Sequence, residues 1–184
     1  ADGHSPVTPL LVNFGVDIDP SYLSGSGDQA ETVEPGAPIA LIHSITGEAI
    51  PVLTEMDQAN RHLEEYETRH PLIIRPLAAM EPGARYIAIL SSDLRDVDGN
   101  ALTSPAVFEA LRDAIPTDDP VVEAMRDRFE DNFAVAEEAG WSRENLLLSW
   151  DFQVASETHL LGPARSIRDQ VMAITSTASP EYTI

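Results

Sequence analysis

A turn followed by a strand, at residues 80–90, constrains the fold more than any other stretch of this chain. Pro82 and Gly83 favour a tight turn, and the alternating pattern that begins at Arg85 predicts a strand directly after it. Tyr86 stands close enough to the turn for its hydroxyl to fold back onto the backbone, an arrangement called a tyrosine corner. Residues 95–100, with an Asp-Gly-Asn sequence, then predict the hairpin turn that ends this strand. We therefore expect an antiparallel β structure built around the corner.

Hydrophobic periodicity and turn residues predict the remaining elements. Further strands are expected at residues 9–16, 38–45, 48–53, 71–76 and 145–155, with Thr46 and Gly47 joining the second and third of them as a hairpin. Helices are expected from residue 104 to about 113, from about 119 to 140, and from 162 towards the C-terminus. Each helix start is marked by a proline that follows serine, aspartate or glycine.

Two amphipathic patterns predict which faces are buried. In the strand at 145–155, Trp150 and Phe152 belong to an apolar face, whereas Ser149 and Asp151 alternate with them and are expected to face water. The final helix is expected to turn its apolar positions inwards: Ala164, Ile167, Val171 and Ile174.

The order of these motifs resembles the bacterial immunoglobulin-like domains of secreted and surface proteins, which are fibronectin-III-like β-sandwiches. In that family a Trp-x-Phe-x-Thr strand follows soon after the Asp-Gly-Asn turn, and here Trp150-Asp-Phe152 takes its place about forty residues later. The resemblance implies a mainly β fold with an α insertion: an immunoglobulin-like antiparallel β-sandwich with a helical insert before the last strand and a C-terminal helix. The expected units are residues 1–103 for the sandwich, 104–144 for the insertion, 145–156 for the last strand, and 157–184 for the final helix and linker.

The insert and final helix also resemble the N-terminal regions of large secreted bacterial esterase- or lipase-like proteins. The motifs are Leu-Ser-Trp-Asp-Phe at residues 148–152 and a following helix that carries Arg165 and Arg168. In those proteins such a module precedes an α/β-hydrolase domain. The resemblance implies a secreted or cell-surface protein, and it carries over no catalytic residue.

The charge balance excludes several partners. The chain has 31 acidic residues and 11 arginines, no lysine, and a formal net charge of −20. Nucleic acid and anionic membranes are therefore not expected to bind, because both require cationic side chains. A highly soluble surface and an adaptation to high salt both explain this composition. The chain also lacks cysteine and any apolar run long enough for a transmembrane helix, so no disulfide and no membrane insertion are expected.

The turn at residues 96–100 is also the one candidate metal site in the sequence. Asp96, Asp98 and Asn100 place oxygen ligands at alternate positions beside a glycine, as calcium loops do. The twelfth position of an EF-hand would be Val107, so a calcium ion would need carboxylates from another loop, such as Asp17 and Asp19. The alternative is a plain hairpin turn, which the Asp-Gly-Asn sequence favours.

Catalytic motifs are absent from the sequence. His62 and His70 do not have the His-Glu-x-x-His spacing that places two zinc ligands on one helix face, and no Gly-x-Ser-x-Gly nucleophile elbow is present. Trp141 follows a predicted helix end, where it either contacts a partner or packs against the helix.

Two classes of function remain. The favoured one is a non-catalytic accessory or interaction module that packs beside a neighbouring domain of the same polypeptide or another protein. The insert is the expected docking surface, because it holds more apolar residues than one sandwich edge needs: Val107, Phe108, Leu111, Val122, Met125 and Phe129. The alternative is a stand-alone hydrolase that uses acidic residues in a cleft between the sandwich and the helices.

Overall fold

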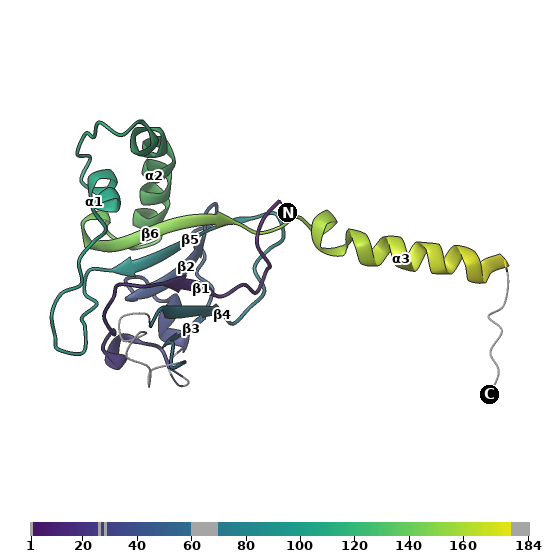
Figure 1. Ribbon diagram of the computed structural model, residues 1–184, viewed down its shortest axis with the longest axis horizontal. Coiled ribbons are helices and arrows are strands. Elements are labelled where there is room, and N and C mark those ends of the chain that lie inside the picture. The colour runs from purple at the N-terminus through teal and green to yellow at the C-terminus, as the bar shows by residue number, and fades with distance from the viewer. Residues whose placement is uncertain (1, 26, 28, 60–69, 178–184) are drawn as a thin grey trace.

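The computed structural model describes residues 2–25, 27, 29–59 and 70–177. Antiparallel pairing arranges six strands into two three-stranded sheets, with the orders β1-β4-β3 and β2-β5-β6 (Figure 1). The described residues therefore form a mixed α/β fold. The strands are β1 (Leu10–Val12), β2 (Ile39–His43), β3 (Val52–Met56), β4 (Leu72–Pro76), β5 (Arg85–Ser91) and β6 (Leu146–Gln153). The helices are α1 (Ala106–Arg112), α2 (Pro120–Glu138) and α3 (Glu157–Thr177), and shorter turns of 3₁₀ helix are η1 (Pro20–Tyr22), η2 (Gln29–Val33) and η4 (Arg143–Asn145).

One apolar cluster contains side chains from both sheets. It contains Leu41 of β2 and Leu90 of β5 from one sheet, and Val52 of β3 and Ile74 of β4 from the other, all of them fully buried. Each of these strands turns alternate residues towards the cluster, because successive side chains of a strand point to opposite faces.

A second apolar cluster covers the other face of the β2-β5-β6 sheet. Helices α1 and α2 lie on this face, and Phe108, Phe129 and Phe133 pack edge to face there with ring centroids about 6 Å apart. Trp141 joins this cluster, 4% exposed, and its indole N–H donates to the carbonyl of Ala37 at 3.0 Å. The sheet is thus buried on both faces, which explains why β2 and β5 are almost continuously apolar.

The tyrosine corner forms as the sequence predicts. The backbone N–H of Glu81 donates to the hydroxyl of Tyr86 at 3.0 Å, and Tyr86 is buried. Gly83 has a φ of 79°, a left-handed conformation that glycine adopts without strain. The backbone N–H of Gly83 also donates to the carbonyl of Ala155, so the corner is attached to the chain just after β6.

Helices α1 and α2 lie in the sequence between β5 and β6, which pair directly. Helix α2 begins where it was predicted: Asp119 accepts a hydrogen bond from the N–H of Val121, and Pro120 is the first helical residue.

The predicted hairpin between residues 38–45 and 48–53 forms only at its turn. His43 and Glu48 are hydrogen bonded through their backbones, and Ile42 forms a bridge to Ala49. The chain then crosses to the other sheet, and β3 begins after Pro51, which lacks the N–H that a continued ladder requires.

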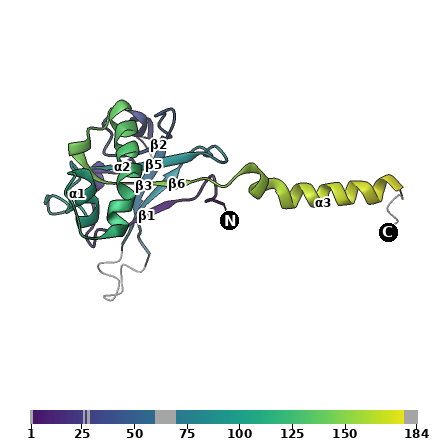
Figure 2. The same cartoon turned by 90° about the horizontal axis from the view of Figure 1, so that it is seen from above.

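Two predictions of exposure were wrong. Ser149 and Asp151, expected to face water, are covered by α2, with 2% of Ser149 and 4% of the Asp151 side chain exposed. Conversely, α3 contains no buried residue and projects away from the two sheets, so its apolar positions do not point inwards (Figure 2). This helix also begins earlier than predicted, at Glu157, because Ser156 caps it by accepting a hydrogen bond from the N–H of His159 at 3.1 Å. Pro163, which was expected at the helix start, therefore lies inside the helix.

Replacing Tyr86 with phenylalanine tests the corner. We expect Tyr86→Phe to lower the free energy of unfolding by about 1–2 kcal/mol, because the N–H of Glu81 loses its acceptor next to a buried ring. Urea denaturation measures the change, and Tyr22→Phe, a phenol in η1 away from the corner, is the matched control. Equal stability of the two variants would show that the hydroxyl bond contributes nothing.

Candidate functional site

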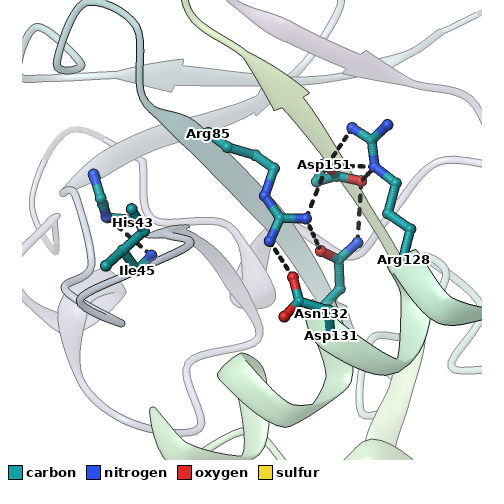
Figure 3. A network of polar contacts seen from close by, with 7 residues as sticks. All are labelled: His43, Ile45, Arg85, Arg128, Asp131, Asn132 and Asp151. Carbon is teal, nitrogen blue, oxygen red and sulfur yellow. Dashed lines mark hydrogen bonds and ion pairs between the residues drawn. The ribbon is translucent and has the colours of Figure 1, made fainter.

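A polar network joins α2 to the β2-β5-β6 sheet, and two of its members, Asn132 and Asp151, have buried side chains (Figure 3). Asp151 of β6 lies at its centre. Arg128 of α2 donates to both carboxylate oxygens of Asp151, with its Nε at 2.9 Å from Oδ1 and 2.8 Å from Oδ2. Asn132 donates to Oδ1 from Nδ2 at 3.1 Å, and Arg85 of β5 lies 3.4 Å from Oδ2.

Arg85 extends the network along α2. Its Nη1 donates to Oδ1 of Asn132 at 2.9 Å, and its Nη2 pairs with Asp131. Asn132 is fully buried, and it satisfies both ends of its amide by accepting from Arg85 while donating to Asp151. Buried polar groups are tolerated at this depth only when they are hydrogen bonded, and this amide meets that requirement.

The electrostatics of Asp151 follow from these contacts. Burial alone raises the pKa of its carboxyl, but hydrogen bonds from Arg128 and Asn132, together with the charges of Arg128 and Arg85, outweigh burial and leave the pKa below its ordinary value. Asp151 is therefore an ionised acceptor that two arginines neutralise, which is an arrangement for holding a helix on a sheet. A general acid needs a pKa raised towards neutrality instead.

Acidic side chains also line a surface concavity of about 490 Å³ at the C-terminal end of α2. Asp93 and Glu137 contribute carboxylates there, beside Ser91 and Asn145. The hydroxyl of Ser91 donates to Asp93 at 3.1 Å. Among the residues described, every carboxyl whose pKa is displaced has it lowered, which is opposite in sign to the displacement of a catalytic acid.

The predicted calcium ligands lie in a tight hydrogen-bonded turn. Oδ1 of Asp96 accepts from the backbone N–H of Asp98 at 2.9 Å and of Asn100 at 2.8 Å, and the side-chain amide of Asn100 donates to Oδ2 at 3.0 Å. Hydrogen bonding from Asn100 is the main cause that lowers the pKa of the Asp96 carboxyl. Gly99 has the positive φ that such a turn requires, at 82°.

The two carboxylates expected to assist a calcium ion lie on an adjacent segment. Ile18 bridges Asp96, and the N–H of Val97 donates to the carbonyl of Asp17, so the segments pair as the calcium hypothesis requires. The carboxylate of Asp19, however, accepts from the N–H of Ser21 at 2.8 Å as the cap of η1. In the part of the chain that the structure describes, no group of three or more acidic or histidine side chains is arranged to hold a metal ion. The calcium site at Asp96, Asp98 and Asn100 stays a prediction.

His70 is the only one of the two candidate histidines that can be placed, since His62 lies outside the described residues. His70 is 7% exposed, and its Nδ1 lies 3.4 Å from a carboxylate oxygen of Asp17. It connects the start of β4 to the segment after β1 and forms no part of a metal cluster in the described chain.

Sequence reasoning missed the network around Asp151. The sequence pattern predicts Arg85 only as the start of the corner strand and Asp151 only as a residue on a solvent-facing side of its strand. One signal was available: Asn132 falls on the apolar stripe of α2, between Phe129 and Ala136, where a polar residue needs buried partners.

Comparison with known proteins assigns no family. No family model matches the chain, and no curated protein matches it. Among solved structures, domains 1–6 of the surface layer protein SbsC are similar over 54% of this chain, with a TM-score of 0.33 and 15% sequence identity. The matched region spans 11% of that protein's chain. The resemblance to a surface-layer protein is thus weak, and at this TM-score it supports no functional argument. None of the described helices is both long enough and apolar enough to cross a membrane.

Neutralising Asp151 tests the network. We expect Asp151→Asn to lower the free energy of unfolding by about 2 kcal/mol at pH 7, because charged hydrogen bonds are lost in a buried place. The folded-state pKa of Asp151 is depressed, so this difference is fully present above about pH 4 and shrinks as the pH falls through the folded pKa. Urea denaturation between pH 2 and 7 measures it.

Asp131→Asn is the matched control. Asp131 contacts Arg85, as Asp151 does, but the side chain of Asp131 is 60% exposed. Its effect is expected to stay below about 1 kcal/mol. A difference between Asp151→Asn and the parent chain that does not change with pH would contradict the assignment.

Calcium titration tests the loop. A calcium ion held by Asp96, Asp98 and Asn100 requires a higher Tm in millimolar CaCl2 than in equal MgCl2, because binding to the folded state alone stabilises it. The rise should disappear in Asp98→Asn, which removes an exposed carboxylate and leaves the hydrogen bonds of Asp96 in place. Equal melting temperatures in the two salts would leave the plain turn as the explanation.

Proposed function

We propose that this chain is a non-catalytic accessory or interaction module of a secreted or surface bacterial protein. Its compact part is an immunoglobulin-like β-sandwich with a helical insert, and its projecting helix α3 packs against a neighbouring domain or another protein. The proposal for the fold is supported by the tyrosine corner at Tyr86 and by the apolar cluster that the two sheets share.

Helix α3 is the observation that carries the functional proposal. It is 21 residues long and contains no buried residue, although several of its side chains are large and apolar. Ile167, Val171, Met172 and Ile174 are each between 51% and 66% exposed. Apolar side chains gathered on an exposed element indicate a contact surface, because leaving them in water is unfavourable.

The insert does not provide the docking surface expected from the sequence. Phe108, Leu111, Val122 and Phe129 are between 1% and 8% exposed and pack on the β2-β5-β6 sheet, so these four side chains are already occupied. Val107 is the exposed member of the set, at 50%. We therefore assign the docking role to α3, whose apolar side chains are exposed.

A polarity-sensitive dye tests the proposal. The chain at submicromolar concentration is expected to bind anilinonaphthalene sulfonate, and the triple variant Ile167→Gln, Val171→Gln, Ile174→Gln should lose most of that fluorescence. Glutamine keeps good helix propensity, so the variant changes the surface and not the helix. The Tm of the compact part should stay unchanged, since these residues bury nothing.

The matched control replaces Ser166 and Ser176, on the polar face of the same helix, with glutamine. This control should bind the dye as the parent chain does. Equal fluorescence from the parent chain and the triple variant would refute a contact surface on α3.

A further inference from the structure

Two backbone N–H groups of the turn after β2 donate to the same histidine nitrogen. Nδ1 of His43 accepts from the N–H of Ile45 at 3.1 Å and from the N–H of Thr46 at 3.3 Å (Figure 3). A backbone N–H is a donor only, so Nδ1 must present its lone pair to both groups. His43 is therefore a neutral imidazole in this arrangement, and its single ring proton lies on Nε2.

The ring of His43 takes the place that an asparagine or aspartate side chain has in an Asx turn. In that turn a side-chain oxygen bonded to Cγ accepts from the backbone N–H two residues later. Nδ1 is likewise bonded to Cγ, and Ile45 is two residues after His43. An imidazole differs from an amide in one respect, because its acceptor nitrogen takes up a proton in the range between pH 5 and 8.

We propose that His43 makes this turn a pH-sensitive switch. Nε2 already holds a proton, so the second proton that His43 gains on acidification must enter at Nδ1. The new N–H then faces the N–H groups of Ile45 and Thr46, and both hydrogen bonds are lost. The switch does not involve α3 and does not rest on the proposed function.

The ring of His43 is fixed from two sides. Its Nε2 lies 3.7 Å from a carboxylate oxygen of Glu81, and only 13% of its side chain is exposed. It also packs edge to face on Tyr86, with ring centroids 5.2 Å apart, and the hydroxyl of Tyr86 accepts from the N–H of Glu81. Because the tyrosine corner holds the ring in both protonation states, we expect the turn to move when Nδ1 is protonated.

The other charged groups near the turn are directed elsewhere. Arg85 turns its guanidinium to the opposite face of the sheet, where it pairs with Asp131. Glu48 accepts from the N–H of His43 through its backbone carbonyl, and its side chain is exposed. Glu138 of α2 lines a concavity on the outer side of the turn. Glu81 is thus the carboxylate that contacts the ring.

Release of the two hydrogen bonds changes the tip of the turn and leaves its ends in place. The N–H of Gly47 donates to the carbonyl of His43 at 2.9 Å, and this backbone bond does not depend on the ring. Ile45 is 85% exposed at the tip, beside Val135 and Ala139 of α2. Acidification is therefore expected to move an exposed apolar side chain relative to the end of α2 while β2 stays folded.

Nuclear magnetic resonance of the full chain labelled with ¹⁵N tests the starting state. At about pH 8, where a histidine is mostly neutral, long-range proton–nitrogen correlations should show the ring proton of His43 on Nε2 and a bare Nδ1. A neutral His43 that carries its proton on Nδ1 would overturn the proposal, because such a ring cannot accept the two bonds of the turn.

A titration of the same sample from about pH 8 to about pH 5 tests the switch itself. The amide protons of Ile45 and Thr46 should move upfield with the same midpoint as the ring nitrogens of His43. Their protection against hydrogen exchange should fall about threefold to tenfold, as expected for the loss of one hydrogen bond each. Amides that stay unchanged while the ring takes up its proton would overturn the proposal.

The variant His43→Asn separates the acceptor from its titration. Asparagine keeps an acceptor on Cγ for the turn and gains no proton in this range, so the amides of Ile45 and Thr46 should keep their protection from about pH 8 to about pH 5. His159→Asn is the matched control, since the side chain of His159 is 48% exposed on α3, and it should respond to pH as the parent chain does. A response that persists in His43→Asn, or that disappears in His159→Asn, would place the switch elsewhere and overturn the assignment.

Discussion

The pairing of β5 with β6 brings together two segments that are far apart in the sequence and on which the other elements depend. Strand β5 lies between β2 and β6, so its side chains contribute to both apolar clusters. The chain between β5 and β6 forms α1 and α2, and these helices return to cover the sheet that the two strands build. The apolar face of these helices completes the burial of the sheet, and a longer connection between two paired strands costs little additional entropy.

Asp151 shows how that helical layer is attached. The apolar stripe of α2 determines which face of the helix meets the sheet. The bonds of Asp151 to Arg128 and Asn132 add directional contacts that restrict the rotation and height of the helix further. A buried carboxylate without partners would destabilise the fold strongly, so the pairing with arginine compensates a cost as much as it adds stability. We expect the network to favour one arrangement of α2 on the sheet. Its position beneath α2 leaves only 4% of the Asp151 side chain exposed.

The molecule separates its packed part from the exposed apolar side chains of α3. The two clusters bury most of the large apolar residues of the sheets and of α1 and α2, whereas α3 contains no buried residue. Gly3 lies where the N-terminal segment approaches the end of β6. A Cβ at this position would lie 2.5 Å from backbone atoms of Val154 and Ala155, so a larger residue does not fit there. The close approach lets the N-terminal segment pair with the end of β6, next to the capping residue of α3.

Much of the local structure was determined by the sequence. The strand positions, the start of α2 at Asp119 and Pro120, and the bond between Tyr86 and the turn before it all depend on neighbours within a few residues, so periodicity and turn chemistry predict them. What only the tertiary structure decided is which faces are covered. Asp151 alternates with apolar residues as an exposed position does, and Ile167 lies on a stripe as an inward position does. Yet the side chain of Asp151 is buried beneath α2, and Ile167 is 64% exposed. Burial depends on elements distant in sequence, and the local pattern of apolar residues does not indicate whether such an element packs against a given face.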